Sequence, residues 1–180
     1  PAGLITALTA KSVYPEKSVC LIKEIGDGVI PCAIPYMMHT LEDPAQNIMG
    51  NMPLEKAGVE VISDKVTGID PQKPAVTTAS GQEIKYERLV LATGLTPAVP
   101  PIPGCDKKGV HAIGKSLAAM SAMREEVKKA KSIVILGGGF IGVEFADEFI
   151  RMPDTEVHIV EMMPEILSAA FDDEICEQAA

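Results

Sequence analysis

The chain has 180 residues, of which 47% are hydrophobic and 23% charged, so it has enough apolar material for a packed core. Its net charge of −9 and 4% aromatic content argue against nucleic-acid and membrane partners, which need basic surfaces or stacking rings. Its cysteines form no CxxC pair, which excludes the usual zinc, iron–sulfur and dithiol spacings. No secretory signal or membrane-spanning run is visible, so we expect a cytoplasmic protein without a metal site.

The first half of the chain mixes helical and strand patterns. Periodicity predicts a helix that starts near Gly3, and Pro31 to Tyr36 predicts a turn into a short helix. Arg88 to Ala92 is apolar enough for a buried strand, and a stiff proline-rich segment follows it. Other strands are predicted from short β-type runs, two of them joined by a hairpin turn at Ser80-Gly81. These runs are 18–22, 59–62, 65–69, 75–79 and 83–86.

The second half has the pattern of a βαβ unit. A helix is predicted over Ser116 to Ala130, and the apolar run Ser132 to Leu136 predicts a buried strand. A glycine-rich turn over Gly137 to Gly142 leads into a helix that ends near Ile150. The run Val157 to Glu161 predicts a second strand, so the order is strand, turn, helix, strand.

The glycine turn has the spacing of a dinucleotide-binding fingerprint, with Gly137, Gly139 and Gly142 as its three glycines. The first glycine permits a tight turn, the second lets the backbone approach a pyrophosphate, and the third lets the helix pack on the strand. The helix N-terminus then favours the anion. Glu161 follows about 20 residues later, where an acid binds the ribose hydroxyls and repels a 2′-phosphate, which favours NAD(H). The alternative is that these glycines merely make a turn.

The start of the chain repeats the second part of this pattern. Gly3, a helix, a strand and Glu24 follow one another at a spacing similar to that from Gly142 to Glu161. If Gly3 is the third fingerprint glycine, the first strand and two glycines would precede residue 1. Taken alone, this half-motif is equally well explained by a glycine at a chain end and an exposed acid.

Two motifs connect these patterns to a known family. The run Leu-Ala-Thr-Gly-Leu-Thr-Pro at 91–97, with spaced prolines after it, and Gly-Gly-Gly-Phe-Ile-Gly-Val-Glu at 137–144 resemble the pyridine nucleotide-disulfide oxidoreductases. Within them the chain resembles the single-cysteine branch of NADH oxidase, NADH peroxidase and coenzyme A-disulfide reductase. The resemblance implies an α/β fold with two incomplete Rossmann-like domains and a small β-meander. Residues 1–108 would belong to the FAD-binding domain and 109–180 to the NAD-binding domain of a homodimer.

The resemblance assigns roles to residues of both domains. Gly3 would be the last glycine of the FAD fingerprint and Glu24 the acid on the FAD ribose. The backbone of Val66 would meet the adenine, while Phe140 would gate the flavin face. Residues that would line FAD or NAD are, in addition to these, Ala92, Thr93, Gly94, Gly137, Gly139, Ile141, Gly142, Glu144 and Glu161.

Cys32 occupies the position at which the single-cysteine branch carries its redox thiol. A cysteine at a helix N-terminus is stabilised as thiolate, which reacts with peroxide to a sulfenic acid or with a small disulfide to a mixed disulfide. The alternative is an inert core thiol. Cys20 is expected in the core, Cys105 in an exposed loop, and Cys176 carries no motif.

These residues together predict an FAD-dependent oxidoreductase. It would take hydride from NADH and pass electrons through flavin and Cys32 to a small-molecule oxidant, namely oxygen, peroxide or a disulfide such as coenzyme A disulfide. A rival is a flavin reductase for a redox-protein acceptor of the rubredoxin or ferredoxin type, which needs no cysteine. Another rival is a non-catalytic nucleotide-binding fragment.

Overall fold

The computed structural model describes residues 1–24, 26 and 28–180. Two compact units divide the chain: Pro1–Gly28 with Met49–Pro97, and Val29–Ile48 with Ala98–Ala180. We describe each by itself and call them the first and the second unit. The predicted extents of the FAD and NAD domains, 1–108 and 109–180, stay a prediction.

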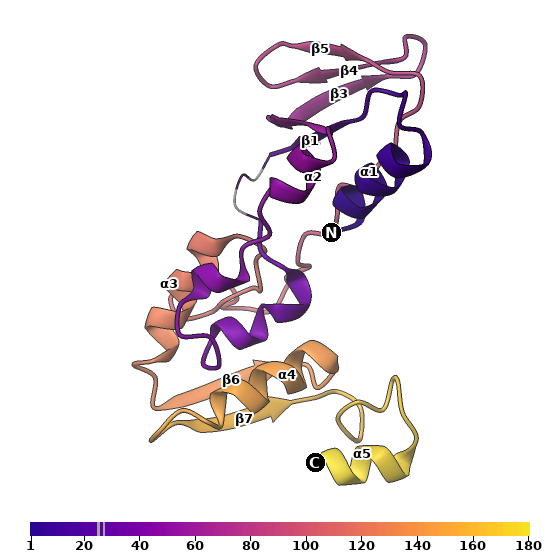
Figure 1. Cartoon of the computed structure of the whole chain (residues 1–180). Coiled ribbons are helices and arrows are strands. Elements are labelled where there is room, and N and C mark those ends of the chain that lie inside the picture. Colours follow the sequence, from indigo (N-terminus) through magenta and orange to yellow (C-terminus); the bar gives the residue numbers. More distant parts are fainter. Residues whose placement is uncertain (25, 27) are drawn as a thin grey trace. The chain divides into compact units, whose positions relative to one another are not determined.

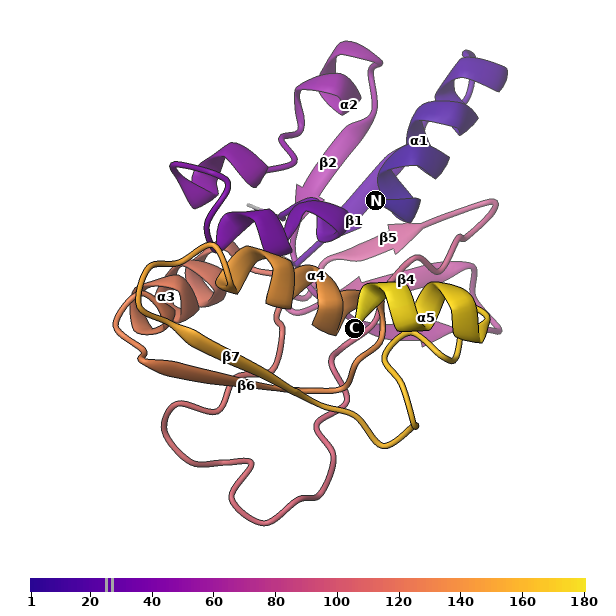
Figure 2. The same cartoon turned by 90° about the horizontal axis from the view of Figure 1, so that it is seen from below.

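The first unit begins with α1 (Ala2–Val13), which leads to β1 (Cys20–Lys23) (Figure 1). After α2 (Met52–Lys56), the strand β2 (Glu60–Ser63) pairs parallel to β1 (Figure 2). Small and medium apolar side chains from these elements form the core of this unit, and a parallel pair needs such cover. The buried members of this core are Ala7, Leu54 and Val59.

A three-stranded antiparallel meander completes the first unit. It consists of β3 (Val66–Asp70), β4 (Ala75–Thr78) and β5 (Glu83–Lys85), in the order β3-β4-β5. Gly81 lies in the β4–β5 turn with φ of +85°, a conformation that glycine adopts without strain. The predicted meander and its hairpin turn are therefore confirmed.

The predicted strand over Arg88 to Ala92 is wrong. This segment forms no strand, and its apolar side chains are exposed, with Val90 at 62% and Leu91 at 67%. An apolar run becomes a strand when a neighbour accepts its N–H and C=O bonds. Among the described residues, no strand pairs with this run. The prediction failed because it rested on apolar composition, whereas a strand forms only where a neighbouring strand can pair with it through backbone hydrogen bonds.

The second unit contains the βαβ motif in the predicted order. Helix α3 (Leu117–Val127) is followed by β6 (Ser132–Leu136), α4 (Phe140–Phe149) and β7 (Glu156–Val160). Strands β6 and β7 pair in parallel from Ser132↔Glu156 to Leu136↔Val160, and α4 packs along them (Figure 2). Ser116 caps α3, since its Oγ accepts the amide of Ala119 at 3.2 Å. Helix α5 (Asp173–Ala179) follows.

Three short 3₁₀ turns belong to the same unit: Pro31–Ala33, Pro35–Met37 and Pro44–Asn47. The predicted short helix at 31–36 is thus two separate turns. Pro35 has no N–H to donate to the carbonyl of residue 31, so an α-helix cannot form across this point. Apolar residues of the second turn share one core with α3 and α4. That core contains two phenylalanines and five methionines: Phe145, Phe149, Met37, Met38, Met120, Met123 and Met152.

No helix in the described part of the chain has both the length and the apolar character to cross a membrane.

Candidate nucleotide and thiol sites

The glycine turn of the second unit has a geometry that depends on its glycines. Gly137 follows β6 with φ of +107°, in the region that favours glycine, and its N–H donates to the Val160 carbonyl at 2.9 Å. A Cβ on Gly142 would overlap the Gly137 carbonyl oxygen and lie 3.4 Å from the Ile135 side chain. Gly142 therefore permits the close approach of α4 to β6 that the fingerprint predicts.

Gly139 marks an open space at the start of α4. It is the N-cap of that helix, and a Cβ built on it would meet nothing within 4 Å. Within the described residues no side chain caps this helix end, so the first-turn amides point out unpaired. A ten-residue helix with free amides and an open approach can hold an anion. The turn therefore fits the pyrophosphate of a dinucleotide.

Glu161 lies against this turn, directly after β7. One oxygen accepts the Gly138 amide at 2.6 Å, and the other accepts the amides of Met162 and Met163 at 2.7 and 2.8 Å. These bonds to Met163 and Gly138 lower the pKa of Glu161, so the carboxylate stays ionised. Gly138, which the sequence analysis gave no role, is tightly placed: its Cβ would lie 2.6 Å from Ile166.

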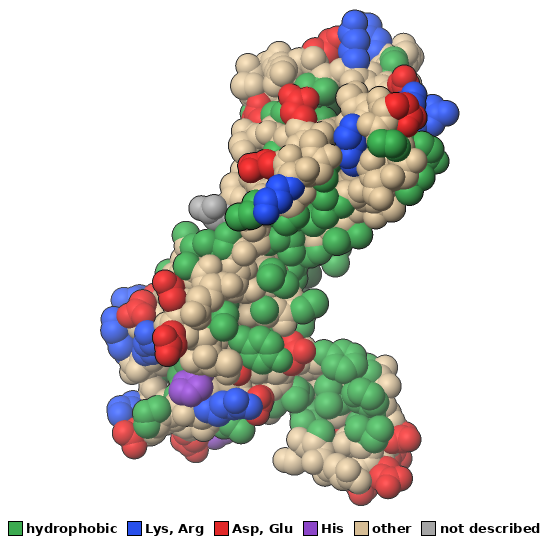
Figure 3. Space-filling view, in the orientation of Figure 1, with side chains coloured by type: hydrophobic (Ala, Val, Ile, Leu, Met, Phe, Trp, Pro, Cys, Tyr) green, Lys and Arg blue, Asp and Glu red, His purple; other side chains and the backbone are tan. Residues whose placement is uncertain are grey.

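The other predicted NAD-side residues are accessible on α4. Phe140 and Ile141 are 56% and 61% exposed, and Glu144 is exposed one turn later. The rings of Phe140 and Phe171 make an edge-to-face contact, with their centroids 5.6 Å apart. Hydrophobic side chains gather near the part of the chain that carries α5 (Figure 3), and Phe171, two residues before α5, is itself exposed. The roles of Phe140, Ile141 and Glu144 stay predictions.

The first unit brings several predicted FAD residues together. Gly3 lies in the first turn of α1, where a Cβ would sit 3.3 Å from both the Leu21 and the Ala92 side chains. This close packing of a helix start on a strand is what the third fingerprint glycine provides. Ala92 therefore lies beside Gly3, and Gly94 follows it with φ of +75° after Thr93. The geometry fits a backbone that approaches a cofactor.

Glu24 and Val66 lie at neighbouring ends of strands in this unit. Glu24 follows β1, and its carboxylate pairs with Lys65 at 3.2 Å, next to Val66 at the start of β3. Val66 is 38% exposed. The arrangement places an acid and an accessible backbone near the end of β1, as a ribose and adenine would require. Their cofactor roles stay predictions.

Cys32 lies in the first 3₁₀ turn and is exposed. The alternative of a buried core thiol is therefore wrong. The expected start of an α-helix is also wrong, since a single 3₁₀ turn lacks the aligned peptide dipoles of a helix. Cys20 is exposed at the start of β1, although the sequence predicted a core position. Cys105 is partly buried, and Cys176 is buried.

Sequence reasoning missed three buried polar side chains that contact residues 30–42, the segment that carries Cys32. Asn47, Arg124 and Glu148 are 2%, 7% and 1% exposed. Glu148 lies between Phe145 and Phe149 on the buried face of α4, and this interruption of an apolar stripe was a usable signal. Within the described residues, no group of His, Cys, Asp and Glu side chains could hold a metal ion.

A model of the pyridine nucleotide-disulphide oxidoreductases matches residues 1–180. The chain is 31% identical over 185 residues to an NAD(P)H sulfur oxidoreductase (CoA-dependent) of Pyrococcus abyssi, covering 98% of this chain and 41% of that protein. It is 30% identical over 193 residues to an NADH oxidase of Methanocaldococcus jannaschii, with the same coverage of both proteins. The chain thus spans about two fifths of the length of these relatives.

Solved structures agree with these sequence matches. The water-forming NADH oxidase of Lactobacillus brevis, bound to NADH, superposes with a TM-score of 0.84 and 25% identity over 98% of this chain and 41% of that one. A ferredoxin reductase of Rhodopseudomonas palustris superposes with a TM-score of 0.81 and 26% identity, covering 98% and 43%. The predicted Rossmann-type α/β fold is therefore confirmed. The chain belongs to the pyridine nucleotide-disulphide oxidoreductase family.

Proposed function

We propose that the chain is part of an FAD-dependent oxidoreductase. It takes hydride from NADH and passes two electrons, through flavin and Cys32, to oxygen, peroxide or a disulfide such as coenzyme A disulfide. The observation that carries the proposal is an exposed single thiol, Cys32, in the same compact unit as a dinucleotide turn with an open Gly139. The names of the relatives, NADH oxidase and CoA-dependent sulfur oxidoreductase, support this class of acceptor.

The glycine turn binds and orients the nicotinamide dinucleotide. Free amides at the start of α4 receive the pyrophosphate, and the open space at Gly139 lets the phosphate oxygens come close. The Glu161 carboxylate lies beside the turn and favours NADH, because a 2′-phosphate would be repelled.

The first unit holds FAD through the residues around Gly3. Ala92, Thr93 and Gly94 line the cofactor, while Glu24 exchanges its Lys65 partner for a ribose hydroxyl. The exposed pair of Glu24 and Lys65 makes this exchange inexpensive, since a surface ion pair contributes about 1 kcal/mol or less. Flavin, when bound, carries the two electrons of NADH toward the thiol.

Cys32 performs the exchange with the acceptor. Its thiolate attacks one sulfur of a disulfide, so the S–S bond breaks, a mixed disulfide with Cys32 forms and one thiolate leaves. Two electrons from NADH then cleave the mixed disulfide, which releases the second thiol and restores Cys32. With peroxide, the thiolate sulfur takes up one oxygen as a sulfenic acid and water leaves. Two electrons from NADH then break the S–O bond, which releases the oxygen as a second water and restores the Cys32 thiolate.

An NADH titration of the flavin-loaded protein tests the proposal. A long-wavelength absorption band from a thiolate next to flavin should grow on reduction, vanish in Cys32→Ser and persist in Cys20→Ser. Cys20 is a matched control, because its thiol is also exposed but lies in the first unit. A band that survives Cys32→Ser would exclude the proposed thiol chemistry.

The second candidate is a flavin reductase that serves a redox protein. The similarity to a ferredoxin reductase favours it. In that case the Cys32→Ser variant should transfer electrons from NADH to ferredoxin or rubredoxin as fast as the unmodified protein does. A disulfide acceptor should stay oxidised with either protein. The third candidate, a non-catalytic fragment, predicts a purified chain without the yellow flavin absorption.

We further propose a cytoplasmic homodimer that acts on small molecules. The four cysteines are free, which agrees with a reducing compartment, and the net charge of −9 disfavours nucleic acid. Size-exclusion chromatography with light scattering tests the dimer, and a monomer would contradict it.

A further inference from the structure

The segment that carries Cys32 is held at both ends by buried polar side chains. We call residues 30–42 the thiol segment. It consists of two 3₁₀ turns and a short tail, so its own backbone bonds span single turns. Such short turns do not maintain a fixed direction by themselves. Their placement depends on contacts with other elements of the second unit.

Glu148 holds the carboxyl end of the thiol segment. Its carboxylate is 1% exposed, and both oxygens bond to Thr40: Oε2 accepts the Thr40 amide at 2.7 Å and Oε1 accepts the Thr40 hydroxyl at 2.7 Å. Charge-assisted bonds of this length belong to the stronger hydrogen bonds in proteins. One side chain of α4 thus fixes both the backbone and the side chain of Thr40.

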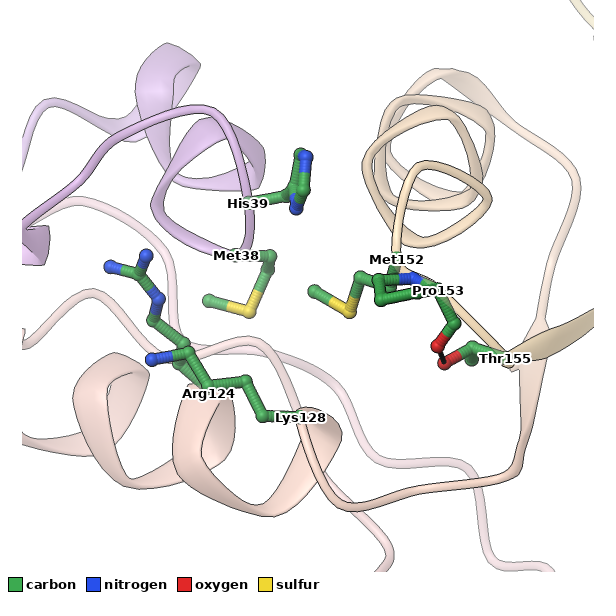
Figure 4. A pocket seen from close by; sticks show the side chains of 7 residues that line it. All are labelled: Met38, His39, Arg124, Lys128, Met152, Pro153 and Thr155. Atoms are coloured by element: carbon green, nitrogen blue, oxygen red, sulfur yellow. Dashed lines mark hydrogen bonds between the residues drawn. The ribbon is translucent and has the colours of Figure 1, made fainter.

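Arg124 of α3 holds the two following residues. Its guanidinium donates to the Leu41 carbonyl at 2.8 Å and to the Glu42 carbonyl at 3.1 Å, and the side chain is 7% exposed. Figure 4 shows Arg124 rising from α3 toward the part of the chain that carries Met38 and His39, beside a pocket of about 210 Å³. The pocket leaves one side of the segment unpacked, so the hydrogen bonds of Arg124 add to the core packing of Met37 and Met38 in fixing the segment.

Asn47 holds the amino end of the thiol segment. Its side-chain amide donates to the Ile30 carbonyl at 3.1 Å, while the backbone carbonyl of Asn47 accepts the Ile30 amide at 3.0 Å. Among the described residues, two buried side-chain atoms lack a partner, Oδ1 of Asn47 and Nε of Arg124. Both belong to this set of contacts.

A gain in stability alone does not explain why these three polar side chains are buried. Burial of charge carries a desolvation cost, and apolar replacements of buried charges are often equally stable or more stable. Unpartnered buried atoms add to the cost. The contacts do, however, give the thiol segment one defined position relative to α4. Helix α4 begins at the dinucleotide turn and packs Phe145 and Phe149 into the same core as Met37 and Met38.

We propose that Glu148 is a positioning residue for Cys32, with Arg124 and Asn47 as its helpers. Through Thr40 it fixes the thiol segment against the helix whose first turn receives the dinucleotide. The inference rests on the proposed function, in which Cys32 exchanges electrons with flavin. A misplacement of about 1 Å at a reacting group can cost about a hundredfold in rate.

The test compares the two half-reactions of the flavin-loaded protein. In Glu148→Ala, reduction of flavin by NADH should change by less than about twofold, while reaction of the reduced protein with a disulfide acceptor should slow by about tenfold or more. Hydrogen exchange gives a readout independent of activity: amides of the thiol segment should exchange faster, and those of β3–β5 should not.

Two further variants separate position from general damage. Glu148→Gln should restore most of the acceptor rate, since its Oε1 accepts the Thr40 amide and its Nε2 donates to the Thr40 hydroxyl. Asp147→Ala is the matched control, because Asp147 is exposed on the same helix and pairs with Arg151. It should leave both half-reactions unchanged.

Three results would overturn the positioning role. These are an equal loss in both half-reactions of Glu148→Ala, unchanged exchange of the thiol segment, or no rescue by Glu148→Gln. If Glu148→Ala does not yield folded protein, Thr40→Val replaces it, since it removes one of the two bonds and no charge. An acceptor reaction unaffected by Cys32→Ser would instead contradict the proposed function, so the two failures differ.

Discussion

The two units contain the same local motif with different outcomes. Each places a helix that begins near a glycine on a parallel pair of strands: α1 on β1–β2 and α4 on β6–β7. In the second unit, the acid after the second strand, Glu161, bonds back to the glycine turn. In the first unit, the corresponding Glu24 pairs with Lys65 of the same unit. The acid therefore takes the nearest donors that its fold offers.

The two units also differ in the size of the side chains that form their cores. The second unit buries aromatic and methionine side chains around α3 and α4, whereas the first unit buries Ala7, Leu54 and Val59. A core of large side chains forms more contacts and fixes its elements more firmly. The same pattern of glycine, helix and acid therefore stands on cores of different size in the two units.

The largest expected effect comes from Gly142→Ala. The new Cβ would overlap the Gly137 carbonyl, so α4 must move away from β6. We expect NADH affinity to fall by about a hundredfold or more and thermal stability to drop. Isothermal titration and thermal unfolding measure both.

Gly139→Ala is the matched control for that change. Its Cβ meets nothing within 4 Å, so the melting temperature should stay the same. NADH affinity should still fall by about tenfold, because the methyl group occupies the space that the pyrophosphate needs. Unchanged affinity would show that the dinucleotide does not approach this glycine.

Removal of one core side chain from each unit sharpens the comparison of the cores. Phe149→Ala, in the larger core, should lower the free energy of unfolding by about 3–5 kcal/mol. Leu54→Ala, in the smaller core, should lower it by about 2–4 kcal/mol. Urea unfolding monitored by circular dichroism gives both values. A greater loss for Leu54→Ala would reverse the ranking of the two cores.

Glu161→Gln and Glu24→Gln test the two acids. The amides that bond to Glu161 lower its pKa, so its contribution to stability is present above the ordinary carboxyl pKa and is lost as pH falls through the lowered value. Glu161→Gln should therefore weaken the pH dependence of the free energy of unfolding below about pH 4.5. It should also raise the ratio of NADPH affinity to NADH affinity by about tenfold. Glu24→Gln should leave that ratio unchanged. Acid titration of unfolding and competition binding provide the measurements.

The smallest expected effect is at Asp64 in the first unit. Its carboxylate accepts the Ser80 hydroxyl at 2.6 Å and the Lys65 amide at 2.7 Å, and these groups hold its pKa at about 2. The contribution of Asp64 to the free energy of unfolding is present above the ordinary aspartate pKa and is lost as pH falls toward 2. Asp64→Asn should remove a small part of the acid sensitivity in that range. Identical acid curves for both proteins would contradict this.

Several elements could be predicted from the sequence because their causes are local. The run Ser132 to Glu161 combines two apolar strands with three spaced glycines, and it forms β6, α4 and β7 as expected. The β3–β5 meander was equally predictable, since its turn requires a residue such as Gly81 with positive φ. Cys32 could be selected, and its exposure agrees with a reactive thiol.

Other predictions failed, two of them because the cause lies in tertiary contacts and one for a local reason. The apolar run at 88–92 needed a neighbouring strand, which composition does not reveal. The helix at 31–36 failed for a local reason that was underweighted, the missing N–H of Pro35. Cys20 is exposed because β1 pairs with one strand, so a position in a strand does not ensure burial.

The sequence by itself determined the glycine turn, the acid after it and a single thiol with no partner nearby in the chain. The tertiary structure decided how the thiol is held. Thr40 and Glu148 are 108 positions apart, and Arg124 is 83 positions from Leu41, yet these pairs form contacts that hold the segment carrying Cys32. No periodicity or spacing contains such pairs, because a buried charge acquires its partners only when the chain folds around it.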